Sequence, residues 1–143
     1  ISGSVSGLSR VGGLVGAFGE ETTYKNILNS YTIANVSGTG DSVGGLVGAV
    51  WGVIYNSYST GSVSGVGDNL GGLIGLSEGA SIFNSFWDIN FSGQETSAGD
   101  EIGKTTEEMK TQSTFSGWDF STVWAINSNV NEGYPYLINN PPR

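Results

Sequence analysis

The sequence predicts an all-β protein: a right-handed parallel β-solenoid of about three coils, followed by a small mixed, aromatic-rich C-terminal cap with one short helix. Three observations predict it. A six-residue motif occurs three times, as VGGLVG at 11–16 and 43–48 and as LGGLIG at 70–75. The copies start 32 and 27 residues apart (11 to 43, 43 to 70), and such spacing is typical of stacked coils. Glycine, β-branched and aromatic residues dominate the repeats, which favours strands over helices.

The spacing divides the chain into a solenoid at 1–93 and a capping segment at 94–143. The solenoid opens with a partial coil at 1–10, because residues 3–7 repeat the letters of 61–65. Three repeats follow, at 11–42, 43–69 and 70–93. The first repeat is longer than the others, and its extra residues are polar and charged. We interpret them, around 19–25, as a loop that leaves the stack.

Each repeat is expected to form three short strands, so that equivalent residues stack about 4.8 Å apart in columns. The columns expected to face inward are Leu14/Leu46/Leu73, Ile27/Ile54/Ile82 and Val36/Val63/Phe91. A polar column is expected at a corner of the coil and consists of Asn29, Asn56 and Asn84. Asparagine caps backbone groups that a tight turn leaves unpaired, and stacked amides bond to one another.

The capping segment departs from the repeat. Residues 105–112 predict a short helix, with Thr105 as its N-cap and Glu108 as the partner in a capping box. Aromatic residues are frequent after this helix. Because the end of a solenoid exposes unpaired strand edges, we expect this segment to cover that end.

The composition excludes several classes of function. The net charge is −8, and a nucleic-acid-binding protein needs the opposite sign. There is no Cys and no His, so thiol nucleophiles, imidazole bases and zinc sites built on these residues are absent. The carboxylate pairs are sequence neighbours, which point apart on a strand or helix. We therefore expect that the chain is not an enzyme and that it binds no cofactor other than calcium. We also expect that this segment does not insert into a membrane.

One column predicts a ligand-binding surface. Leu28, Tyr55 and Phe83 alternate with the inward isoleucines and should therefore face outward. An exposed apolar stripe on a solenoid usually marks an interaction surface, and a host or matrix glycan or protein is the expected partner. The alternative is that the inserted loop or the C-terminal tail covers the stripe.

Two turns contain candidate ligands for a calcium ion. GTGDS at 38–42 and GVGDN at 65–69 place Asp41 and Asp68 in settings similar to the calcium-binding nonapeptide of β-rolls. In that nonapeptide one more residue separates Gly from Asp. The alternative is that both aspartates only form turns.

The motif VGGLVG, followed by NSYSTGSVSG at 56–65, resembles the GLUG repeat. The ending, with NSFWD at 84–88 and GWDFSTVWAIN at 117–127, resembles the closing segment of such arrays. The resemblance implies an extracellular or cell-surface microbial protein, because GLUG repeats occur in adhesins and in some immunoglobulin-cleaving peptidases outside the catalytic part.

The resemblance carries no catalytic residue to this chain and implies a non-catalytic structural or adhesive module. Two alternatives stay open. The chain could be a glycan- or protein-binding adhesin tip that uses the exposed stripe, or the non-catalytic repeat region of a secreted protease or polysaccharide-active enzyme.

The unfinished first coil also predicts assembly. Its open edge should expose Val5, Val11 and Leu14, and the other end should offer Phe91, Tyr134 and Tyr136. A head-to-tail contact between copies would then propagate as a filament. The alternative partner is a neighbouring repeat of a longer chain.

Overall fold

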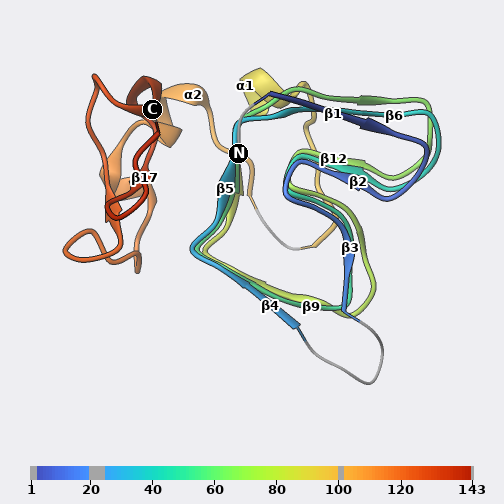
Figure 1. Cartoon of the computed structure of the whole chain (residues 1–143), viewed down its shortest axis with the longest axis horizontal. Coiled ribbons are helices and arrows are strands. Elements are labelled where there is room, and N and C mark those ends of the chain that lie inside the picture. Colours follow the sequence, from blue (N-terminus) through green and yellow to red (C-terminus); the bar gives the residue numbers. More distant parts are fainter. Residues whose placement is uncertain (1–2, 20–24, 100–101, 143) are drawn as a thin grey trace.

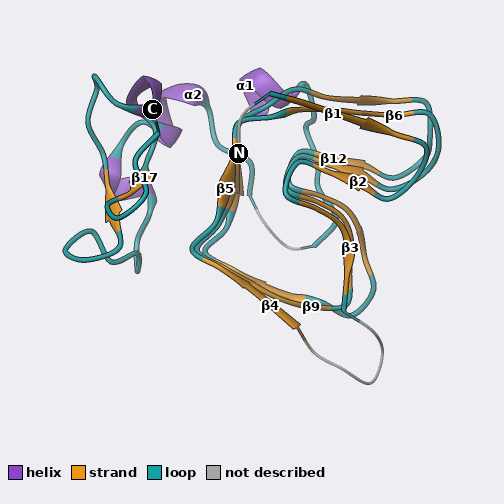
Figure 2. Ribbon diagram, viewed as in Figure 1, coloured by secondary structure: helices purple, strands orange, loops and turns teal. Residues whose placement is uncertain are grey.

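The computed structural model describes residues 3–19, 25–99 and 102–142. Its repeat part consists of five parallel ladders, each with one strand from each of three coils (Figures 1 and 2). The predicted all-β parallel solenoid of about three coils is therefore confirmed. Each described coil has five short strands. The expected number of three strands per coil was therefore wrong. The motif VGGLVG bends in its middle, so it contributes two strands instead of one.

The strands of each coil stack on their equivalents in the next. The first coil contains β1 (Ser4–Gly7), β2 (Val11–Gly12), β3 (Val15–Phe18), β4 (Lys25–Leu28) and β5 (Tyr31–Thr32). The second contains β6 (Asn35–Gly38), β7 (Val43–Gly44), β8 (Val47–Val50), β9 (Gly52–Tyr55) and β10 (Tyr58–Ser59). The third contains β11 (Val63–Gly65), β12 (Leu70–Gly71), β13 (Ile74–Ser77), β14 (Ser81–Phe83) and β15 (Phe86–Trp87).

The C-terminal segment has little regular structure. Its elements are α1 (Ile89–Ser92), α2 (Thr106–Met109), the 3-10 turns η1 (Gln112–Thr114) and η2 (Asn131–Gly133), and the antiparallel pair β16 (Trp124–Ala125) and β17 (Tyr136–Leu137). Helix α2 has the predicted capping box between Thr105 and Glu108. Hydrogen bonds from Thr105 lower the pKa of the exposed Glu108 carboxyl. The described residues thus contain two short α-helices where one was expected.

The predicted inward columns of leucine and isoleucine form the core. Leu46, Ile54 and Leu73 are fully buried, and Ile54 pairs in register with Ile27 below and Ile82 above. Each apolar side chain thus packs on its own equivalent in the next coil, which removes a continuous apolar column from water.

The expected inward position of Phe91 was wrong. Val36 and Val63 are buried as predicted, but Phe91 lies in helix α1 and is 55% exposed. The cause lies at Asp88, whose carboxylate accepts the N–H groups of Asn90 and Phe91. This N-cap turns the chain into a helix where the other coils continue toward their next strand.

The bend within the motif requires glycine. A Cβ on Gly44 would lie 2.0 Å from the carbonyl oxygen of Val47 and 2.6 Å from the nitrogen of Gly75 in the next coil. No side chain fits between these backbone atoms. Gly12 and Gly71, at the same position of the other coils, meet the equivalent carbonyl oxygen just as closely.

The Asn-Ser pairs form the corner between the fourth and fifth strands of each coil. Asn29, Asn56 and Asn84 have φ values of 46°, 47° and 48°, the left-handed region that asparagine tolerates better than other side chains. The side-chain hydrogen bonds between coils at this corner are made by serine, whereas stacked asparagine amides were expected. The Ser57 hydroxyl accepts the N–H of Ser30 and donates to the carbonyl of Tyr55.

The register also locates the insertion in the first repeat. Phe18 pairs with Val50, and Lys25 pairs with Gly52, so the extra residues of the first repeat fall between β3 and β4 in the sequence. That they form a loop which leaves the stack stays a prediction. Residues 20–24 of this segment lie outside the described residues.

The C-terminal segment covers the end of the solenoid, as predicted, and its aromatic tail also lies beside the coils. Figure 1 shows the tail next to the strand stack that contains β5. The shorter stretch 94–98 covers the end: the N–H of Gly72 donates to Thr96, and the N–H of Ala98 donates to Ile74. The aromatic tail packs on the flank because an aromatic column faces outward there.

The stacked core predicts the effect of shortening one leucine. Leu46→Ala should lower the free energy of unfolding by about 2–5 kcal/mol, because it opens a cavity at a fully buried position. Urea unfolding followed by circular dichroism measures the change. Leu8→Ala is the matched control, since Leu8 is 72% exposed. Equal losses in the two variants would contradict this description of the core.

Candidate functional site

The flank of the solenoid carries an aromatic column that the tail covers. Tyr31, Tyr58 and Phe86 occupy equivalent positions in the three coils. The rings of Tyr31 and Tyr58 stack 5.1 Å apart. Tail residues pack against this column from outside: Met109, Phe115, Trp118, Trp124 and Tyr134 are all buried there. This second core holds the tail on the repeats and is separate from the aliphatic core inside the coils.

Asp88 joins the repeats to the tail. Its side chain is fully buried, and Oδ1 accepts three hydrogen bonds, two from the start of α1 and one from the Thr106 hydroxyl. Oδ2 accepts a hydrogen bond of 2.7 Å from the Tyr134 hydroxyl. A buried carboxylate is tolerated when donors surround it in this way. One side chain thus connects β15, α1, α2 and the tail.

Tyr134 is buried against other residues of the same chain. The residue is only 3% exposed, and burial, together with the hydrogen bond to Asp88, raises the pKa of its hydroxyl. The expectation that Tyr134 reaches a neighbouring copy is not met, because its ring packs against Tyr58 of the same chain. Tyr136 is half-buried and pairs with Ala125 in the small antiparallel sheet.

The predicted stripe does face outward. Leu28, Tyr55 and Phe83 are 52%, 39% and 44% exposed and lie side by side on β4, β9 and β14. The rings of Tyr55 and Phe83 stack with centroids 4.8 Å apart. The tail packs on the neighbouring column one corner further along the coil, so it does not cover the stripe.

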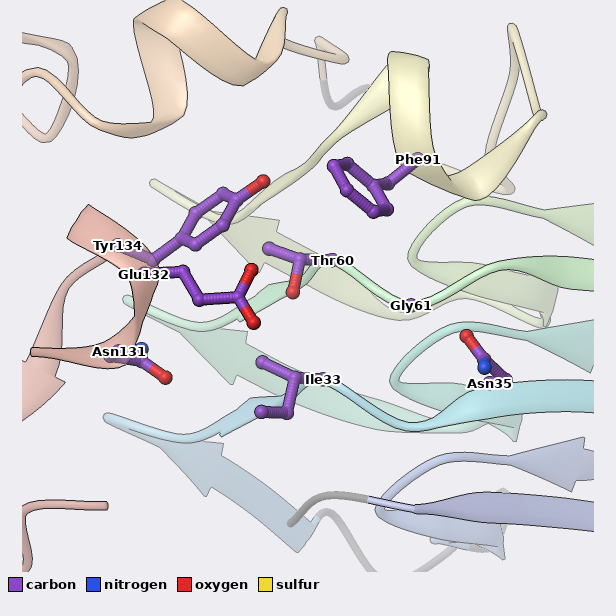
Figure 3. A pocket seen from close by; sticks show the side chains of 8 residues that line it. All are labelled: Ile33, Asn35, Thr60, Gly61, Phe91, Asn131, Glu132 and Tyr134. Atoms are coloured by element: carbon purple, nitrogen blue, oxygen red, sulfur yellow. The ribbon is translucent and has the colours of Figure 1, made fainter. Parts of the chain in front are cut away.

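A second surface feature was missed by the sequence analysis. A hollow of about 120 Å³ lies between the solenoid flank and the tail (Figure 3). Ile33, Asn35, Thr60 and Gly61 form its floor, Phe91 of α1 stands on one side, and Asn131, Glu132 and Tyr134 stand on the other. These residues come from segments far apart in the sequence, so no local motif indicates them.

Two residues of this hollow have unusual backbone geometry. Asn131 and Glu132 have φ values of 52° and 54°, a conformation that costs non-glycine residues about 1 kcal/mol or more each. The Asn131 amide holds the turn by donating to the Tyr58 hydroxyl and to the carbonyl of Pro135. The sequence signal was Asn-Glu-Gly at 131–133, but turn residues of this kind are common at surfaces.

The two candidate calcium ligands lie in stacked turns. Asp41 Oδ1 accepts the N–H of Asp68 at 3.2 Å, which is the turn role that the sequence analysis gave as the alternative. Within the described ranges, no three His, Cys, Asp or Glu residues gather as a metal site would require. Calcium binding by Asp41 and Asp68 stays a prediction.

The two ends of the solenoid differ. All strands of the first coil lie at the outer edge of their ladders, and Val5 and Leu14 are only half-buried there, whereas Val11 is 5% exposed. At the other end, the stretch 94–98 bonds to the third coil. In the described part of the chain, no helix is long and apolar enough to span a membrane.

The junction at Asp88 predicts the effect of removing one hydroxyl. Tyr134→Phe should lower the free energy of unfolding by about 1.5–3 kcal/mol, because it leaves one oxygen of a buried carboxylate without its donor. Thermal unfolding measures the loss. Tyr136→Phe is the control and should change stability by less than about 0.5 kcal/mol, since that half-buried residue has no side-chain hydrogen bond among the described residues. Equal effects would contradict the role given to Asp88.

Comparisons with known proteins agree with the geometry. The family model described as the GLUG motif matches residues 39–64. The fold is similar to the crystal structure of a "putative immunoglobulin A1 protease" from Bacteroides ovatus, with a TM-score of 0.68 and 18% sequence identity. That alignment covers 96% of this chain and 55% of the other, so this chain spans about half the length of that protein. No curated protein sequence matches. The predicted resemblance to GLUG-repeat proteins is therefore confirmed, and the matched motif begins in the second coil and ends in the first strand of the third.

Proposed function

We propose that this chain is a non-catalytic extracellular module that closes one end of a β-solenoid and accepts a further coil of the same kind at its open end. The observation that carries the proposal is a difference between equivalent residues. Leu46 and Leu73 are fully buried, but Leu14, at the same position in the first coil, is only half-buried. One more coil would bury it as its equivalents are buried.

Backbone hydrogen bonding supports the same partner. Within the described ranges, the strands β2 to β5 each pair on one side only, and an edge of unpaired backbone groups favours the addition of another strand. A coil of the same repeat offers five strands at the correct spacing and angle. An unrelated partner would have to match all five edges separately.

The closed end argues against a head-to-tail filament. The third coil already uses its outer edge within the chain: Gly72, Ile74 and Trp87 bond to the segment that follows the repeats. A second copy that docked there would first have to displace this segment. A neighbouring repeat is therefore the favoured partner of the open edge, and an extracellular or cell-surface location is part of the same proposal.

Adding a coil tests the module. A copy of residues 43–60 placed directly before Gly3 would add four strands in register with β2 to β5, because Val5 aligns with Val36 and Val63. The midpoint of urea unfolding should rise, and the amides of β2 to β5 should gain protection from hydrogen exchange. A variant with the same added residues in scrambled order is the control. An equal midpoint in the extended and scrambled chains would reject the proposal.

A second candidate function is ligand binding by the exposed stripe. The stacked rings of Tyr55 and Phe83 support it, because a flat aromatic face of this kind suits the apolar face of a sugar or an aromatic side chain. A glycan array and a cell-adhesion assay provide the test. Tyr55→Ala should lower binding at least about tenfold, whereas Leu8→Ala, another exposed apolar residue, should leave it unchanged. No binding by the unmodified chain would dismiss this candidate.

The third candidate is the repeat region of a secreted protease or polysaccharide-active enzyme. The likeness to the Bacteroides ovatus structure supports it only at the level of the fold, because the identity is 18%. It assigns no catalytic role to this chain either. This candidate therefore differs from the first proposal only in the domains joined to the module. The role of the module itself is the same in both.

A further inference from the structure

The hollow beside the tail has an unpaired negative charge. Figure 3 shows the Glu132 side chain reaching over the solenoid flank toward Thr60. Among the described residues this carboxylate has no ion-pair partner, since the one salt bridge there joins Lys104 to Glu108. Lys110 lies over the ring of Tyr134, with Nζ 4.7 Å from the ring centroid. Among the described residues, no Lys or Arg lines the hollow.

An exposed aromatic ring faces the same hollow. Phe91 is 55% exposed, although helix α1, which carries it, is held at its start by the buried Asp88. A fixed ring with an open face attracts cations through its quadrupole, and a nearby carboxylate adds to that attraction. Glu132 and Phe91 therefore favour the same kind of ligand from opposite sides.

The size of the hollow limits the ligand. Its volume is about 120 Å³, and a cavity of about 150 Å³ holds one benzene molecule. The hollow thus accepts the end of one side chain, while pockets for whole small-molecule ligands are usually about 300 Å³ or more. A sugar ring with its hydroxyl groups would lie largely outside it.

The turn that carries Glu132 is held in place before any ligand arrives. The Asn131 amide bonds to Tyr58, which belongs to the buried flank, and to Pro135. This anchoring keeps two consecutive residues in the left-handed conformation. Strained backbone at a fixed position is typical of functional sites, where it directs a side chain.

We propose that the hollow between Glu132 and Phe91 binds the cationic end of a lysine or arginine side chain of a partner polypeptide. The ammonium or guanidinium group would lie between the carboxylate and the aromatic ring, with its aliphatic stem over Ile33. The site is independent of the open edge of the first coil. It gives the flank of the module a contact point for basic protein surfaces, and the net charge of −8 favours the approach of such surfaces.

Nuclear magnetic resonance titration of the whole chain tests the site. The probe is a Gly-Lys-Gly peptide with blocked termini. The control peptide has norleucine in place of lysine and therefore lacks the positive charge. The lysine peptide should shift the amide resonances of Thr60, Gly61 and Glu132 with a dissociation constant of roughly millimolar order. The norleucine peptide should leave them in place. Added salt should weaken the binding.

Matched variants separate the charge from the fold. Glu132→Gln keeps the shape of the side chain and should weaken binding at least about tenfold. Glu78→Gln removes the same charge at an exposed turn outside the hollow and should leave binding unchanged. Phe91→Ala should weaken binding without unfolding the protein, because the residue is exposed.

Several outcomes would overturn the proposal. They are the absence of shifts with the lysine peptide at millimolar concentration, equal shifts with the norleucine peptide, and unchanged binding by Glu132→Gln. A neutral oligosaccharide that shifts the same resonances when the lysine peptide does not would assign the hollow to glycans instead. None of these results depends on whether the first coil accepts another coil.

Discussion

The stacking of each residue on its equivalent in the next coil is the constraint on which the rest of the structure depends. A position that is apolar in one coil must be apolar in its neighbours, as Ile27, Ile54 and Ile82 are. A bend that excludes Cβ in one coil excludes it in all, so Gly44 has equivalents on both sides. The same constraint creates surface features: one exposed aromatic side chain becomes a stripe, and one aromatic position on the flank becomes a column that the tail can cover.

The chain leaves this constraint at Asp88. Up to Trp87 the third coil pairs with the coil before it in the same way as the other coils do. From Asp88 onward the ladders end, and hydrogen bonds to the Asp88 side chain hold the chain in place. Its carboxylate collects donors from α1, α2 and the tail. Both the covered end and the covered flank follow from this junction, as does the position of the hollow between them.

Sequence reasoning succeeded mainly where the stacking constraint acts; outside the repeats, it predicted the capping box of α2 but little else. The period predicted the parallel coils, the inward leucines and isoleucines, the exposed stripe and the site of the insertion. It failed at Phe91, because Phe-Ser-Gly imitates the Val-Ser-Gly of the other coils while an N-cap three residues earlier ends the repeat. The number of strands per coil depends on backbone angles inside a glycine pair. The hollow at Glu132 depends on how the tail docks, and no local pattern encodes that.

The tail has the height of three coils. Trp124 contacts Tyr31 in the first coil, and Phe115 contacts Phe86 in the third, so the aromatic layer matches the stack from bottom to top. A solenoid with one coil fewer would leave part of this layer bare, and a coil added below would extend past its lower margin. The flank residue of such an added coil would face water, where a polar side chain is favoured. In any array with further coils, the three coils that contact the tail would therefore carry aromatic flank residues, and the remaining coils would favour polar residues at the same position.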